Sequence, residues 1–190
     1  TVAQWRLRHP ETVLVLSDHL NDELMAALNN GELDIGLGLD FGLAPGVAAA
    51  FVAEDELVAV LADTHRLSRR AAVTWQDLKH EPLAVLSRGS TYEMIVSTLR
   101  QQGADLAATD TLNYTDTLYS LVRAGLRVGL ISRLYTQGQR VDGLAIVPVQ
   151  RPQMTRRICL MTRAPESQAR AAVQRCYAEL AAMLRGRAGP

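Results

Sequence analysis

The sequence predicts an α/β protein with two lobes that are connected by more than one crossing segment. Strand-like runs alternate with helical patterns along the chain. Several of these runs are apolar throughout, which is typical of strands buried on both faces of a parallel sheet. Strand-helix-strand patterns lie on both sides of a polar stretch, residues 68–82, and late strand-like runs are placed to rejoin the first half. These three observations predict the fold class and its division into lobes.

The first half of the chain begins with a strand-helix-strand unit. Residues 13–16 (VLVL) form an apolar run that we expect to be a buried strand. In the helical pattern that follows, Asn21 is placed to cap the helix and Gly31 to end it. Residues 33–40 (LDIGLGLD) predict a second buried strand. A unit of this kind is expected to have a right-handed crossover.

Two further strand candidates meet at the acidic residues 54–56. They cover residues 47–55 and 56–67, and they either pair with each other or leave the second as a long connector. The stretch 68–82 is polar, mixed in charge and closed by Pro82, so it is the best candidate for a domain junction.

The second half repeats the strand-helix plan twice. Residues 83–87 predict a strand, which is followed by a turn rich in Ser, Gly and Thr and by a helix that stops at Gly103. Residues 109–131 follow the same plan, with Thr115 or Asp116 as the N-cap of the helix. The chain then predicts strands at 144–149 and 156–164, a helix at 167–184 and a frayed tail at 185–190.

The two glycines of VRAGLRVGLI, residues 122–131, stand in the wrong order for a phosphate-binding loop. Such a loop follows a strand and opens a helix, because backbone N–H groups and the helix dipole must point at the anion. Here Gly125 follows a helical pattern and suits a left-handed helix end, while Gly129 lies inside a strand. We therefore expect both glycines to shape the fold.

The turn SRGST, residues 87–91, is the better candidate for binding an anion. Ser87, Ser90 and Thr91 offer hydroxyl groups, Gly89 lets a ligand approach the backbone, and a helix N-terminus follows. An ordinary Ser/Thr helix cap explains the same residues equally well. The turn NYTDT, residues 113–117, stands one unit later, and both turns are expected at the carboxyl ends of their strands, facing one crevice.

Signs of catalysis and of metal binding are weak. The four histidines lie apart, none is spaced from another histidine or a cysteine as metal ligands are, and no G-x-S-x-G elbow occurs. A Ser/His/Asp arrangement that assembles only in space stays open as an alternative. Cys159 and Cys176 lie in apolar patterns, so we expect buried thiols without a structural disulfide. No cofactor is predicted.

Charge and hydropathy bound the partners of the chain. Its 190 residues carry 20 Lys and Arg against 20 Asp and Glu, so no basic surface predicts direct contact with DNA. No apolar run approaches the length of a membrane span, and no signal-peptide pattern opens the sequence. We expect a soluble, cytoplasmic protein.

Several segments together resemble the effector-binding domain of LysR-type transcriptional regulators. They are RHPETVLVLSDHLNDELMAALNNGELDIGLG, LVAVLADTHRL, VTWQDLKHEPLAVLS and LVRAGLRVGLI, in the family's order from residue 8 to 184. The resemblance implies two Rossmann-like lobes joined by two crossover segments, as in type 2 periplasmic binding proteins. Lobe I would comprise residues 1–64 and 144–184 and lobe II residues 83–140, with crossover segments at 65–82 and 141–143.

The resemblance also implies a small effector in the cleft between the lobes. Asn21 matches a small polar position where an effector carboxylate is often met. Leu39 stands where some members carry arginine, so Arg88 becomes the charged partner of a small, anionic organic effector. The residues expected to line the cleft are Asn21, Leu37, Gly38, Leu39, Ser87, Arg88, Gly89, Ser90, Thr91, Asn113, Tyr114, Thr115 and Ser132, the last through its hydroxyl.

The function implied is effector sensing and dimerisation, without catalysis, in a regulator that assembles as a homodimer or tetramer. The resemblance places the winged helix that binds DNA, and the first strand of lobe I with its effector-binding turn, outside this sequence. Two alternatives stay open: the solute-binding protein of a transporter, and an α/β enzyme that uses the same cleft.

Overall fold

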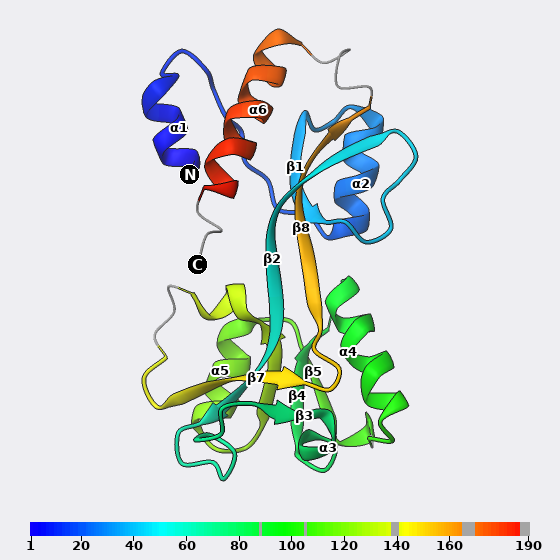
Figure 1. Cartoon of the computed structure of the whole chain (residues 1–190), viewed down its shortest axis with the longest axis vertical. Helices are drawn as coiled ribbons and strands as arrows, with labels where there is room; N and C mark the ends of the chain where they lie inside the picture. The colour runs from blue at the N-terminus through cyan, green and yellow to red at the C-terminus, as the bar shows by residue number, and fades with distance from the viewer. Residues whose placement is uncertain (88, 105, 138–140, 165–169, 187–190) are drawn as a thin grey trace. The chain divides into compact units, whose positions relative to one another are not determined.

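A computed structural model of the chain divides into two compact units (Figure 1). It describes residues 1–87, 89–104, 106–137, 141–164 and 170–186. Unit 1 comprises Thr1–Glu54 and Arg156–Pro190, and unit 2 comprises Asp55–Thr155. The chain therefore passes from one unit to the other twice, once within a long strand and once at the start of another.

Unit 1 is a small sheet with a helix on each face. Its elements are α1 (Val2–Arg8), α2 (Asn21–Asn30), β1 (Ile35–Leu39), the first half of β2 (Val47–Ala62), most of β8 (Thr155–Arg163) and α6 (Ala171–Arg185). β1 pairs antiparallel with β8, so that Leu37 lies opposite Leu160. Side chains alternate along β8: Cys159 and Met161 pack among the α2 side chains, while Leu160 packs among those of α6.

The C-terminal helix α6 carries α1 on its surface. Trp5 is 2% exposed, and its ring stacks on the imidazole of His9 with 4.3 Å between the ring centroids. His9 Nε2 lies 2.7 Å from the carboxylate of Glu179 in α6. A buried aromatic ring and one polar contact therefore hold α1 in place.

The expected buried strand at residues 13–16 does not form. These residues have no strand conformation, and the side chains of Val13 and Val15 are 85% and 86% exposed, while Leu14 alone packs against the core. An apolar run becomes a buried strand only where a neighbouring strand and a covering helix accept it. Among the described residues of unit 1, no strand pairs with this run.

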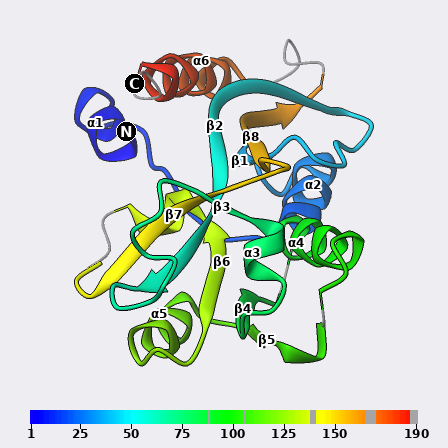
Figure 2. The same ribbon diagram turned by 60° about the horizontal axis from the view of Figure 1, so that its bottom comes forward.

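Unit 2 is built on a mixed sheet whose central strands are parallel (Figure 2). Its strands are the second half of β2, β3 (Val73–Thr74), β4 (Leu83–Leu86), β5 (Thr109–Leu112), β6 (Val128–Ser132) and β7 (Leu144–Gln150). β4 pairs in parallel with both β5 and β6, whereas β2 runs antiparallel to β6 and β7. Its helices are α3 (Trp75–Leu78), α4 (Ser90–Gln101) and α5 (Thr115–Arg123), with 3-10 turns η1 (Leu106–Ala108) and η2 (Arg133–Thr136).

The two faces of this sheet bury separate apolar clusters. On one face Leu57, Leu61 and Val85 pack with Ile95 and Leu99 of α4. On the other face Val58, Val60 and Ala84 pack with Leu118 and Val122 of α5. Side chains that are apolar on both faces explain why these strands read as continuous apolar runs.

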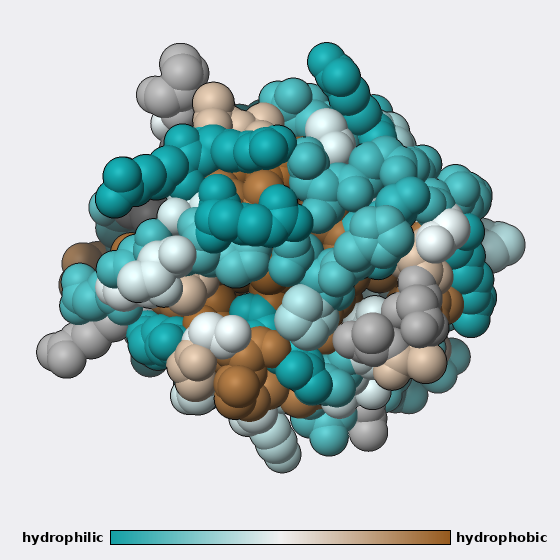
Figure 3. Space-filling view, turned by 90° about the horizontal axis from the view of Figure 1, so that it is seen from below, coloured by the Kyte–Doolittle hydropathy of each residue, from teal (hydrophilic) through white to brown (hydrophobic). Residues whose placement is uncertain are grey.

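The space-filling view in Figure 3 shows a face on which hydrophilic residues predominate, with apolar residues between them.

The boundaries expected from the sequence differ from those of the two units. β2 is one strand of 16 residues, neither a hairpin nor a strand with a connector, and its residues 58–62 pair inside unit 2. Residues 55–64 and 144–155 therefore belong to unit 2, although the sequence placed them in lobe I. The expected junction at 68–82 is also part of unit 2, where Trp75 and Leu78 are fully buried.

The glycines of the VRAGLRVGLI segment have the roles that their order predicts. Gly125 (φ 69°) follows α5, where its N–H donates to Val122 O and the next N–H, of Leu126, to Leu121 O, a Schellman motif. Gly129 lies in β6 beneath α5, and a Cβ there would stand 2.5 Å from Cδ2 of Leu118. The first glycine ends a helix, and the second lets the helix approach the sheet.

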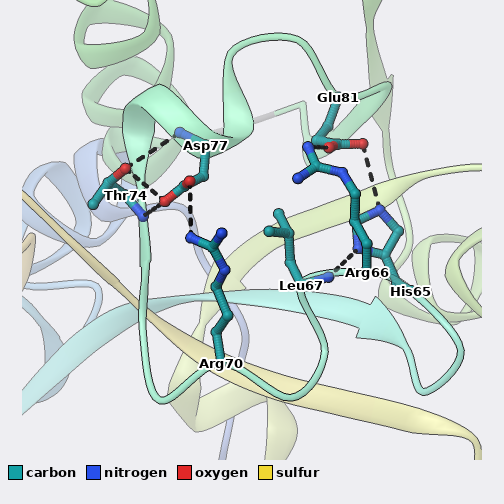
Figure 4. Close-up of polar contacts among 7 residues, drawn as sticks. All are labelled: His65, Arg66, Leu67, Arg70, Thr74, Asp77 and Glu81. Carbon is teal, nitrogen blue, oxygen red and sulfur yellow. Dashed lines mark hydrogen bonds and ion pairs between the residues drawn. The ribbon is translucent and has the colours of Figure 1, made fainter.

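Two acidic residues, Glu81 and Asp77, organise hydrogen bonds and ion pairs in the segment between β2 and β4 (Figure 4). Glu81 pairs with Arg66 and with His65, whose Nδ1 accepts a hydrogen bond from the N–H of Leu67 at 3.2 Å. At the start of α3, the hydroxyl and N–H of Thr74 both donate to Asp77, and Arg70 pairs with the same carboxylate. The Thr74 hydroxyl, then its N–H, and the nearby Arg70 hold the pKa of Asp77 below its ordinary value.

Replacing Gly129 with alanine is expected to destabilise the protein by about 1–3 kcal/mol, because the new methyl overlaps Leu118. Urea unfolding measures the change. Gly103→Asn is the matched control, since Gly103 (φ 72°) has open space around its Cβ position and asparagine tolerates that backbone. Equal stability of the two variants would contradict the close approach of α5.

Asp77→Asn is expected to cost about 1 kcal/mol of stability at pH 7, as the loss of a helix cap does. The pKa of Asp77 is lower in the folded protein than in the unfolded chain. The carboxylate therefore contributes to stability above its ordinary pKa, and this contribution is lost as the pH falls through the pKa of the folded state. The difference in unfolding free energy between wild type and variant should therefore shrink as the pH falls below the ordinary pKa of 3.8. A difference in stability that does not change with pH would contradict this role of the carboxylate. Asp18→Asn, in an exposed segment, is the control.

Candidate functional site

Two turns of unit 2 meet at the carboxyl ends of β4 and β5. The N–H of Ser87 donates to Leu112 O at 2.8 Å, which extends the parallel pairing by one bond. The Ser87 hydroxyl donates to Asn113 Oδ1 at 2.6 Å, and this pair is exposed to solvent. The expectation that successive turns face the same edge of the sheet agrees with this contact.

The rest of the first turn is only partly described. Gly89 (φ 86°) is the N-cap residue of α4, and nothing lies within 4 Å of its Cβ position. Ser90 is the first helical residue and Thr91, which is half-buried, the second. Arg88, expected as the charged partner of an effector, lies outside the described residues, as does the side chain of Ser90. The Gly89 carbonyl accepts from the N–H of Tyr92 at 3.0 Å, as expected at the start of a helix.

The helix after the second turn, α5, begins at another residue than the sequence predicted. The N-cap residue of α5 is Tyr114, with a side chain 73% exposed, whereas Thr115 and Asp116 lie inside the helix. No side-chain hydrogen bond caps this helix. β5 ends at Leu112, so only Asn113 and Tyr114 separate the strand from the first helical residue, Thr115.

In unit 1, Asn21 joins the start of α2 to the end of β1. It was expected to cap the helix, but it is the first helical residue, and Glu23 instead accepts from the N–H of Leu20. Asn21 Oδ1 accepts from the N–H of Leu39 at 2.9 Å, and Nδ2 donates to Phe41 O at 3.0 Å. The amide is therefore used on both sides by the backbone.

The glycines and leucines of β1 complete this corner. A Cβ on Gly38 would stand 2.8 Å from Asn21 Oδ1 and 2.6 Å from a methyl of Leu24. Leu37 and Phe41 are 54% and 57% exposed. The corner therefore presents apolar side chains to solvent, while its polar groups bind each other.

Ser132 does not offer its hydroxyl to a ligand. The residue is 1% exposed, and its hydroxyl donates to the carboxylate of Asp55, which is itself 5% exposed. The expected contact of this hydroxyl with an effector stays a prediction, and in the structure the hydroxyl is already bound to Asp55. A serine at the end of a strand looks accessible in sequence, and its buried acceptor is 77 residues away.

The described residues give little support to catalysis. No group of three or more His, Cys, Asp and Glu side chains in these ranges is arranged to hold a metal ion. Ser87, a candidate nucleophile, donates its hydroxyl to an amide oxygen, which is no general base. None of the helices described is long and apolar enough to cross a membrane.

Both cysteines are free and buried, on opposite faces of the unit 1 sheet. Cys159 packs with α2, and Cys176 belongs to α6. Burial raises the pKa of each thiol above its ordinary value. Neither the geometry nor the acidity favours a disulfide or a reactive thiolate.

The fold defines the class of the protein: two α/β units joined by two crossing segments, of the type 2 periplasmic-binding-protein-like kind. The family model described as "LysR substrate binding domain" matches residues 1–185, and the chain belongs to this family.

The relatives found by sequence similarity are described as transcriptional regulators. One is the uncharacterized HTH-type transcriptional regulator YvbU of Bacillus subtilis, 27% identical over 162 residues, which cover 84% of this chain and 53% of YvbU. Another is a probable nitrogen assimilation transcriptional activator of Synechococcus elongatus, 28% identical over 170 residues, with 87% and 53% covered. The chain spans about half the length of these relatives.

Solved structures show the same fold at lower identity. The LysR family regulator HinK of Pseudomonas aeruginosa has a TM-score of 0.82 at 18% identity, with 99% of this chain and 65% of HinK covered. The reduced form of OxyR has a TM-score of 0.77 at 21% identity, with 98% and 86% covered. No transporter protein stands among these relatives, so the transport alternative has no support.

In the native protein we expect neither Cys159 nor Cys176 to react with a thiol reagent such as DTNB, because both are at most 4% exposed. Both should react after unfolding in guanidinium. Ser97→Cys, on the exposed surface of α4, provides a control for rapid reaction. Rapid native reaction of the wild type, or a disulfide detected by mass spectrometry, would contradict the burial of the thiols.

Proposed function

We propose that this chain senses a small, anionic organic effector and mediates dimerisation in a LysR-type transcriptional regulator. The observation that carries the sensing role is the hydrogen-bonded pair Ser87–Asn113 at the carboxyl ends of two parallel strands. In this proposal the intact regulator is a cytoplasmic homodimer or tetramer that contacts DNA through another segment and catalyses no reaction.

The pair supplies donors for an oxygen-rich group. Because the Ser87 hydroxyl donates to Asn113 Oδ1, the amide is oriented with its two N–H donors turned away from Ser87. The first N–H groups of α5 have no side-chain cap, and a helix N-terminus favours negative charge. Together these donors suit a carboxylate.

Unit 1 carries the other expected effector contacts. The resemblance to the family predicts a carboxylate near Asn21, but this amide is already bound to Leu39 and Phe41. Breaking those bonds would leave backbone groups unpaired, which is unfavourable. The exposed side chains of Leu37 and Phe41 leave this corner of unit 1 with apolar groups as its accessible surface.

Sensing requires that the effector bind one conformation better than another. A ligand shifts a conformational equilibrium only by the difference between its affinities for the two states. In the intact regulator, the favoured conformation would then change how the dimer presents its DNA-binding segments. An α/β enzyme is the weaker alternative, because Ser87 meets an amide and no base.

A thermal-shift screen of small organic acids should identify a stabilising effector, and Asn113→Ala should weaken its binding about tenfold through loss of a charge-assisted hydrogen bond. Isothermal titration calorimetry measures the affinity. Ser120→Ala is the matched control, since its exposed hydroxyl bonds only its own helix. If no acid stabilises the protein, or if Asn113→Ala and Ser120→Ala bind equally well, the proposed site is wrong.

A further inference from the structure

The Ser87–Asn113 pair limits what kind of acid can bind beside it. A serine hydroxyl has one proton to donate and two lone pairs that accept, whereas an amide has two N–H donors and one accepting oxygen. The Ser87 hydroxyl donates its proton to Asn113 Oδ1 at 2.6 Å. Toward a ligand, the Ser87 oxygen can therefore only accept, while the Asn113 nitrogen can only donate.

This pattern does not depend on which end of the amide faces Ser87. If the nitrogen faced Ser87, it would donate to the hydroxyl oxygen, and the hydroxyl proton and the amide oxygen would be left for a ligand. In both arrangements the pair offers a ligand a donor from one residue and an acceptor from the other. A group that only accepts, such as a plain carboxylate, therefore satisfies half of the pair.

Negative charge lies on the side of the sheet that Ser87 faces. Val85 of β4 lies opposite Leu130 of β6, and both pack on the side covered by α4. Two residues further along each strand, Ser87 and Ser132 therefore face the same side. The Ser132 hydroxyl gives its proton to the carboxylate of Asp55, which is 5% exposed. A carboxylate on this side disfavours a second anionic group near Ser87 and favours a hydrogen-bond donor there.

We propose that the effector is a small carboxylic acid with a hydrogen-bond donor, a hydroxyl or an ammonium group, next to its carboxylate. The carboxylate accepts from the amide of Asn113, and the neighbouring group donates to the oxygen of Ser87. The two groups must be close together in the effector, because the two side chains that bind them are themselves hydrogen-bonded. This class of effector rests on the proposed sensing function, which it narrows to hydroxy and amino acids.

The experiment uses the full-length regulator and sets of acids that differ in one group. Acetate, propanoate and phenylacetate are each compared with their 2-hydroxy, 2-amino and 2-methoxy derivatives by thermal shift, and the stabilising acids are titrated by calorimetry. We expect the 2-hydroxy or the 2-amino acid of a set to bind about tenfold more tightly than the plain acid, which leaves the Ser87 oxygen without a donor. The 2-methoxy acid cannot donate and should bind no better than the plain acid. Comparison of the 2-hydroxy with the 2-amino acid distinguishes a hydroxyl from an ammonium group.

A matched pair of variants tests the role of Ser87 as the acceptor. Ser87→Cys keeps a proton for Asn113 but presents sulfur, a weak acceptor, so the preference for the substituted acid should fall to about twofold. The plain acid should still bind within about threefold of its wild-type affinity, because the donors of Asn113 remain. Ser97→Cys is the control and should keep the tenfold preference, since the Ser97 hydroxyl bonds within its own helix, to Met94 O.

The outcomes separate this effector class from the sensing function. If plain acids stabilise the protein and bind as tightly as their 2-hydroxy and 2-amino derivatives, the proposed class is wrong and the sensing function stands. An equal preference in Ser87→Cys and Ser97→Cys would also overturn it. If no acid of any set stabilises the protein, the effector class and the sensing of an organic acid fail together.

Discussion

The arrangement of unit 2 depends on the buried carboxylate of Asp55, which requires hydrogen-bond donors in place of water. An ionised carboxylate leaves water only where donors replace its hydration. Ser132 and the N–H of Leu134 do so, which ties the end of β6 to the middle of β2. β6 lies between β2 and β4, and β4 pairs with β5, so the register passes from strand to strand. The turns at Ser87 and Asn113 stand at the end of this sequence of pairings.

The parts of the fold that local chemistry determines were predictable, and those that depend on distant partners were not. Gly125 and Gly129 followed from their order relative to a helix and a strand. Residues 13–16 look like a buried strand, yet burial requires a neighbour that no local pattern specifies. The length of β2 was missed because its acidic residues look like a break, whereas the partners that accept Asp55 lie 77 and 79 residues away. The two units of the structure also divide the chain at other residues than the lobes expected from the sequence.

The candidate site shows the same division. The turns of unit 2 could be found from sequence because parallel strands end at a common edge, which brings Ser87 and Asn113 together. The role of Asn21 could not, because an asparagine at a helix start reads as a cap. Its amide instead joins two backbone groups at the end of β1. Polar residues at a helix start are therefore ambiguous until the partners of their side chains are known.

Packing constrains some positions of this fold and leaves others open. At Gly38 and Gly129 a side chain would overlap neighbours within 3 Å, so these positions are restricted by packing. At Gly89 the surroundings are open, although its φ of 86° still favours glycine, and Asn113 faces solvent, so packing restricts neither position. A fold maintained at 18% identity is therefore compatible with different chemistry at the turns. Under the proposed sensing function, these turn residues are the ones that would select the effector, since the apolar cores serve the scaffold that holds them.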